Sequence, residues 1–137
     1  MNLLSPNFSI EELTFSQTAS RNNLDNTPTP DIVNNLTLLC INVLEPLREL
    51  KGAIRVTSGY RSPAVNKLVG GQSNSQHCVG QASDILFPVS GMTLEELWKW
   101  IPTTNIEYDQ LIFEYNSWLH LSLNAGNNRR TSLRIGC

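Results

Sequence analysis

The chain contains two histidines, and both stand in settings that suit metal coordination. His77 lies in the stretch SQHCVGQASD, which also carries Asp84, with six residues between the two. His120 lies in WLHLSL, where every second residue is a leucine. Two imidazoles and one carboxylate are enough to hold zinc and to leave its fourth position for water. Spacing alone also allows a plainer interpretation, in which His120 is a hydrogen-bonded strand residue and Asp84 is a turn or cap residue.

The composition fits one ordinary domain, residues 1–137, with a single apolar core. Hydrophobic residues make up 40% of the chain and charged residues 16%, and the formal net charge is −2. This balance gives no basic surface for nucleic acid, so we expect no nucleic-acid partner. No segment approaches the roughly 20 apolar residues that span a bilayer, so we expect no membrane insertion. We expect a monomer.

The first residues, MNLLSPNFSIEEL, lack the basic start, long apolar run and cleavage site of a secretory signal peptide. We therefore expect synthesis in the cytoplasm. If the target lies outside the cytoplasm, another component must deliver the protein, such as a membrane-permeabilising partner or a larger particle.

The three cysteines, Cys40, Cys78 and Cys137, are odd in number and widely spaced, which argues against a disulfide framework. Cys40 falls in an apolar helical run and is expected in the core. Cys78 stands beside His77, but adjacent residues seldom point at the same ion. A role for Cys78 as metal ligand or nucleophile is therefore the less favoured interpretation.

Capping signals and apolar spacing predict four helices, over residues 10–15, 30–47, 63–69 and 93–101. Ser9 with Glu12, and Thr93 with Glu96, form capping boxes before two of them. In the longest helix, Pro46 should kink or tighten the last turns.

Alternating apolar residues predict strands over 53–58, 82–87, 110–115 and 118–123, and a last short strand over 132–135. A tight turn around Asn116-Ser117 should join the third and fourth of these. The polar stretches 16–30 and 70–76 are expected to be loops. Because helices come first and antiparallel strands later, the fold class is α+β.

Three linked motifs resemble those of peptidase family M15, the zinc D-Ala-D-Ala carboxypeptidases and endopeptidases. They are SGYRS at 58–62, S-x-H-x-x-G-x-A-x-D at 75–84 and W-x-H at 118–120, in the family's order. The nearest likeness is to the small phage-associated branch, and it extends into the N-terminal NFSIEELTFSQTASR and the long helix. The resemblance implies N-terminal helices packed on a small antiparallel sheet that carries the metal site, a hedgehog/DD-peptidase-like fold.

The resemblance also implies roles for single residues. His77, Asp84 and His120 match the family's three ligands for one zinc ion. Arg61 matches the arginine that positions the substrate, and a guanidinium suits a carboxylate or a peptide carbonyl. The residues expected to bind substrate or to support the ligands are Arg61, Ser75, Gln81, Tyr60 and Trp118.

Family members place the catalytic base, an acid, shortly before the last histidine. Here the nearest is Glu114, with five residues between it and His120; many relatives have the acid three positions ahead, where this chain has Ser117. Glu107 and Asp109 are the fallback candidates. For Glu114 to share a face with His120, the loop between the strands must have three residues, expected as 116–118, or the hairpin must carry a bulge.

The function that the resemblance implies is hydrolysis of a peptide bond in the peptidoglycan stem peptide. Zinc would activate a water molecule, Glu114 would accept the water proton, and Arg61 would hold the substrate. The alternative is a catalytically silent zinc-containing module that binds the cell wall or forms part of a virion. In either case, we expect action at the bacterial cell wall if the protein is delivered there, in phage lysis or in a virion; without delivery the sequence does not give the location.

Overall fold

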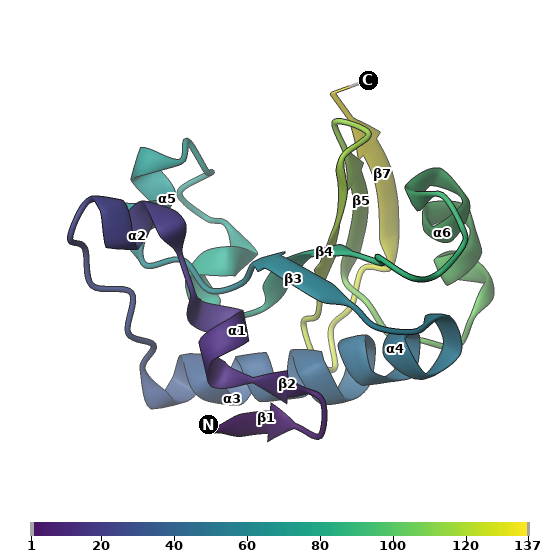
Figure 1. The fold of residues 1–137 in the computed structure, drawn as a ribbon, viewed down its shortest axis with the longest axis horizontal. Coiled ribbons are helices and arrows are strands. Elements are labelled where there is room, and N and C mark those ends of the chain that lie inside the picture. Colours follow the sequence, from purple (N-terminus) through teal and green to yellow (C-terminus); the bar gives the residue numbers. More distant parts are fainter. Residues whose placement is uncertain (1, 137) are drawn as a thin grey trace.

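A long helical segment runs along one side of the molecule, and a five-stranded sheet stands over it in the computed structural model, which describes residues 2–136 (Figure 1). The α-helices are α1 (Ile10–Thr14), α2 (Gln17–Arg21), α3 (Pro30–Leu39), α4 (Glu45–Lys51), α5 (Pro63–Leu68) and α6 (Leu94–Trp100). The strands are β1 (Leu3–Ser5), β2 (Phe8–Ser9), β3 (Arg55–Ser58), β4 (Ala82–Leu86), β5 (Gln110–Glu114), β6 (Trp118–Ser122) and β7 (Thr131–Ile135). The predicted α+β class is confirmed.

The long helical segment starts at a threonine cap and passes through a π-helical turn before its proline. The side chain of Thr29 caps α3 by accepting a hydrogen bond from the backbone N–H of Ile32. Between α3 and α4 the chain forms a π-helical turn, Cys40–Leu44, rather than a plain kink. The wider turn lies directly before Pro46, which has no N–H to donate. The helical segment therefore continues past Pro46 and ends at Lys51, whereas the sequence predicted an end at residue 47.

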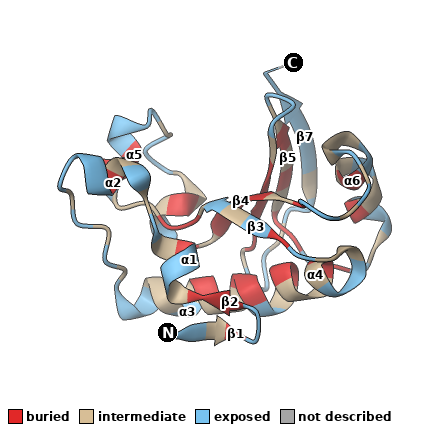
Figure 2. Ribbon diagram, in the orientation of Figure 1, coloured by how far each residue is buried: buried red, intermediate tan, exposed pale blue. Residues whose placement is uncertain are grey.

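The core lies between the long helix and the sheet, as Figure 2 shows by the buried positions along both. Cys40 is fully buried there, as predicted. Burial raises the pKa of the Cys40 thiol to about 12, so it remains protonated at neutral pH. Cys137 lies outside the described residues. Within residues 2–136, none of the helices has the length and apolar character that a membrane span requires.

The sheet has the strand order β3-β4-β6-β5-β7. Four strands are antiparallel to their neighbours as predicted, but β7 pairs with β5 in parallel, so the wholly antiparallel prediction is wrong at this edge. The start of β7 is held at the start of β5, because the N–H of Thr131 donates to the carbonyl of Asp109 and Arg129 pairs with the Asp109 carboxylate. Two strands held together at their starts run in the same direction.

The sequence analysis missed several short elements. β1 and β2 form a small hairpin ahead of α1. α2 lies in the stretch predicted as loop, capped by Ser16, whose side chain accepts a hydrogen bond from the N–H of Ala19. A 3-10 helix spans Gln76–Val79. Each has five residues or fewer, too short for apolar periodicity to reveal.

Replacing a core leucine of the long helix should show how far the fold depends on this helix. Leu39 is fully buried, so Leu39→Ala should lower the free energy of unfolding by about 2–5 kcal/mol, measured by urea denaturation. Leu50, in α4, is 57% exposed and is the matched control, whose replacement by alanine should cost less than about 0.5 kcal/mol. Equal losses in the two variants would contradict the packing described here.

Candidate metal centre and active site

Two of the predicted ligands lie directly opposite each other on neighbouring strands. β4 and β6 are antiparallel, and their register places Asp84 across from His120. Directly opposed residues on such a pair point to the same face of the sheet. Both side chains are buried, and Nδ1 of His120 lies 3.2 Å from Oδ1 of Asp84. The sheet therefore supplies two ligand atoms at one point.

The third predicted ligand, His77, comes from outside the sheet, on the 3-10 helix. Ser75 caps this helix by accepting a hydrogen bond from the backbone N–H of His77, at 3.1 Å. Nδ1 of His77 lies 2.7 Å from the carbonyl oxygen of Gly59. Because a carbonyl can only accept, Nδ1 carries the proton and Nε2 holds the lone pair. It is Nε2 that faces Asp84.

Gly59 can lie this close to His77 because it has no side chain. A Cβ atom on Gly59 would lie 2.2 Å from the backbone carbonyl oxygen of Leu13. The next two residues fix the same backbone path, since the N–H of Tyr60 donates to that Leu13 oxygen and the N–H of Arg61 donates to the carbonyl of His77. The SGYRS motif is thus a backbone clamp on the histidine.

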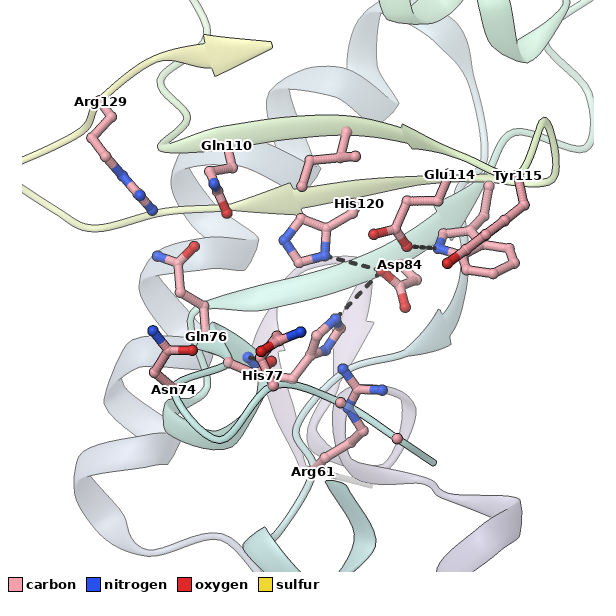
Figure 3. Close-up of a pocket in the computed structure, with 16 residues that line it drawn as sticks. Arg61, Asn74, Gln76, His77, Asp84, Gln110, Glu114, Tyr115, His120 and Arg129 are labelled. Atoms are coloured by element: carbon pink, nitrogen blue, oxygen red, sulfur yellow. Dashed lines mark hydrogen bonds and ion pairs between the residues drawn. The ribbon is translucent and has the colours of Figure 1, made fainter. Parts of the chain in front are cut away.

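The three ligand atoms form a group that fits a metal ion (Figure 3). Nε2 of His77 lies 3.4 Å from Oδ1 of Asp84, and Nδ1 of His120 lies 3.2 Å from the same oxygen. Two ligand atoms on one tetrahedral zinc ion lie about 3.3 Å apart, which matches both separations. Nε2 of His77 and the carboxylate are both acceptors, so only a cation or a proton between them makes their approach favourable.

Asp84 is ionised although it is buried. Burial alone would raise its pKa, but interactions with His120 and then with His77 outweigh burial and hold the pKa well below its usual range. The ionised carboxylate is the form that binds a metal ion. Cys78 does not belong to this group of ligand atoms.

Glu114 lies on the same face of the sheet as His120. The β5–β6 hairpin pairs Glu114 with Trp118, which is two residues from His120 and therefore shares its face. The loop has three residues, 115–117, and the N–H of Ser117 closes it by donating to the carbonyl of Glu114. The loop length is one that the sequence analysis allowed. The expected position, 116–118, is wrong by one residue, because Tyr115 and Asn116 adopt the left-handed conformation that turns the chain.

Trp118 fixes the carboxylate of Glu114. Its indole N–H donates to Oε2 of Glu114 at 2.5 Å. The ring of Tyr115 packs against Trp118 with centroids 5.6 Å apart. The bond from Trp118 engages Oε2, which leaves Oε1 of this cavity-lining residue for a ligand or a water molecule.

Arg61 presents an unpaired donor at the same place. Its Nε atom is buried and has no hydrogen-bond partner in the part of the chain that the structure describes. Buried donors in proteins are nearly always paired, and an acceptor on a ligand in the cavity would pair this one. Arg61, Glu114, Trp118 and the three ligands line a single cavity of about 470 Å³ (Figure 3).

Comparison with protein families gives a match that covers most of the chain. The family described as Peptidase M15 matches residues 6–122. The chain belongs to peptidase family M15. No curated protein matches it. Membership in this family supports a metal-dependent peptidase, and the His-Asp-His group is a possible site for its metal.

In this M15 chain the other predicted site residues lie at different distances from the cavity. Ser75 lines it. Gln81 does not; its side-chain oxygen accepts a hydrogen bond from Gln76, which does line it. Tyr60 is buried in the core, away from the cavity lining, and its predicted contact with substrate finds no support there.

Neither fallback base lines the cavity of this M15 chain. Glu107 is exposed elsewhere. Asp109 is buried, and Arg129 binds its carboxylate through Nε and Nη2, at 3.0 and 2.8 Å. Arg129 itself lines the cavity, as does Gln110. The sequence analysis named neither as a site residue, because neither belongs to the three linked motifs and the pairing of Arg129 with Asp109 is not visible in the sequence.

Metal binding can be tested on the purified M15 protein. We expect one divalent ion per chain by elemental analysis, and a lower melting temperature after dialysis against a chelator, because a metal that binds the folded state alone stabilises it. His120→Ala should abolish both effects. Affinity should also fall at acidic pH, because protons compete for the imidazole nitrogens. A melting temperature that the chelator leaves unchanged would contradict the metal centre.

Proposed function

We propose that the protein is a zinc-dependent peptidase that hydrolyses a peptide bond in the peptidoglycan stem peptide, as a D-Ala-D-Ala carboxypeptidase or an endopeptidase. The observation that carries the proposal is the convergence of His77, Asp84 and His120 in a cavity that Glu114 and Arg61 also line. The SGYRS, S-x-H-x-x-G-x-A-x-D and W-x-H motifs support the substrate class. The bacterial cell wall is the proposed place of action.

Two imidazole nitrogens and one carboxylate oxygen favour zinc over magnesium or calcium, which prefer oxygen ligands. Three protein ligands are typical of a catalytic zinc site rather than a structural one. When bound, the ion would lower the pKa of a water molecule and polarise the scissile carbonyl.

The protein's own groups carry the proton and hold the substrate. Oε1 of Glu114 accepts the proton of the attacking water and returns it to the leaving amine, while Oε2 remains hydrogen-bonded to Trp118. Arg61 donates to a carbonyl or carboxylate of the substrate and so fixes the scissile bond beside the ligands. No covalent intermediate is needed.

The direct test is digestion of purified peptidoglycan, with mass analysis of the released fragments. Fragments that appear with zinc and not with chelator would identify both the metal dependence and the bond that is cut. A protein that binds zinc but releases neither amino groups nor D-Ala would instead be a catalytically silent wall-binding module.

Glu114→Gln should lower kcat by about 10²- to 10⁴-fold, because the amide cannot accept the proton. Its zinc content should stay at the wild-type level, since Glu114 is not among the ligand atoms. Glu107→Gln is the matched control, because Glu107 is exposed outside the cavity. Full activity of Glu114→Gln would rule out this residue as the base.

Trp118→Phe should lower kcat by about tenfold with little change in KM, because it removes the N–H that orients Glu114 but keeps an aromatic ring. In Glu114→Gln protein the same change should have no further effect on kcat. Trp98→Phe is the control, since its indole N–H has no partner among residues 2–136. Additive losses in the double variant would contradict a positioning role for Trp118.

A further inference from the structure

The cavity extends along β5 to both sides of the metal ligands. Ile112 lies opposite His120, which itself lies opposite Asp84, so these residues mark the centre. Gln110 and Glu114 lie two residues to either side on the same strand and the same face, each roughly 7 Å from the centre along the strand. Both line the cavity. The cavity is thus long enough to hold peptide on both sides of the scissile bond.

Arg129 stands at the Gln110 end of this cavity in a fixed orientation (Figure 3). Its Nε and Nη2 atoms donate to the two oxygens of Asp109, at 3.0 and 2.8 Å, and its backbone N–H donates to Oδ1 at 2.7 Å. Gln76 adds a fourth donor to that carboxylate, at 2.9 Å. The side chain of Arg129 is nevertheless 58% exposed, and Nη1 takes no part in these bonds.

The charges around the cavity differ between its two ends. Asp84 lies at the centre and Glu114 on the side away from Arg129, whereas the amide side chains of Asn74, Gln76 and Gln110 lie on the same side as Arg129 (Figure 3). The one carboxylate behind that end, Asp109, is already satisfied by its four donors. A rigid guanidinium edge among amide groups favours an anionic acceptor with two oxygens.

We propose that the Arg129 end of the cavity is a substrate subsite that binds a free carboxylate carried by the peptide some two residues from the scissile bond. An extended peptide advances about 3.3–3.6 Å per residue, so a substrate group that reaches the Arg129 end of the cavity lies about two residues from the scissile bond. The proposal rests on the proposed function and narrows its substrate to stem peptides with a free internal carboxylate. Arg61 would then bind the substrate groups that lie nearer the metal ligands.

The test compares the binding of peptides that differ in one carboxylate. The parent is L-Ala-γ-D-Glu-L-Lys-D-Ala-D-Ala; in one analogue the α-carboxylate of D-glutamate is an amide, and in the other the C-terminal carboxylate is. Calorimetry on zinc-loaded Glu114→Gln protein gives each Kd without turnover. We expect amidation of D-glutamate to raise Kd about tenfold or more, the effect of losing one charge-assisted hydrogen bond.

Adding Arg129→Gln should bring the parent and the D-glutamate amide to the same Kd, while the effect of the C-terminal amide persists. Arg130→Gln is the matched control: Arg130 is adjacent, donates to the carbonyl of Ile106 and does not line the cavity. It should leave the tenfold ratio intact. Should Arg129→Gln fail to fold, Arg129→Lys keeps the charge beside Asp109 but loses the planar fork, and should reduce the ratio.

Three outcomes would overturn the subsite. The Glu114→Gln protein could bind the parent peptide and the D-glutamate amide with the same Kd, or the ratio of these two Kd values could persist in both Arg129 variants. The third outcome is that amidation of the C-terminal carboxylate alone raises Kd. Failure of the proposed function shows differently. In that case zinc-loaded wild-type protein hydrolyses none of the three peptides, whatever the Kd values are.

Discussion

The site depends first on the register between β4 and β6. Asp84 and His120 share a face only because they are directly opposed. A slip of one residue would turn one of the two side chains to the other face of the sheet and separate the ligand atoms. The leucines that alternate with His120 resist such a slip, since Leu119 and Leu121 are fully buried on the opposite face. Core packing therefore sets the position of the metal ligands.

The second constraint brings His77 to that pair from outside the sheet. Its ring is held by the Gly59 carbonyl, and its backbone carbonyl is held by Arg61. One short segment therefore fixes the protonation of the histidine and carries the arginine proposed to hold the substrate. A shift of this segment would move a ligand and a substrate contact together, which explains why glycine and arginine stand two residues apart in one motif.

Much of this arrangement could be predicted from the sequence. Capping boxes at Ser9 and Thr93 marked true helix starts, and the linked motifs named the three residues that converge. Other parts depend on contacts that no local pattern shows. The parallel direction of β7 follows from the ties to Asp109, and those ties also place Arg129 in the cavity. An arginine in a polar tail looks the same in sequence wherever its partner lies.

The position of Glu114 shows how an acid at a different spacing can still share the face of the last histidine. Relatives with an acid three positions before the last histidine would place it where this chain has Ser117, inside the hairpin loop. Here the acid stands on the neighbouring strand instead, across from Trp118. Because the loop has three residues, strand alternation returns Glu114 to the face of His120. The hairpin therefore places an acid that is separated from the histidine by five residues in sequence on the same face of the sheet, where the indole N–H of Trp118 fixes the orientation of its carboxylate.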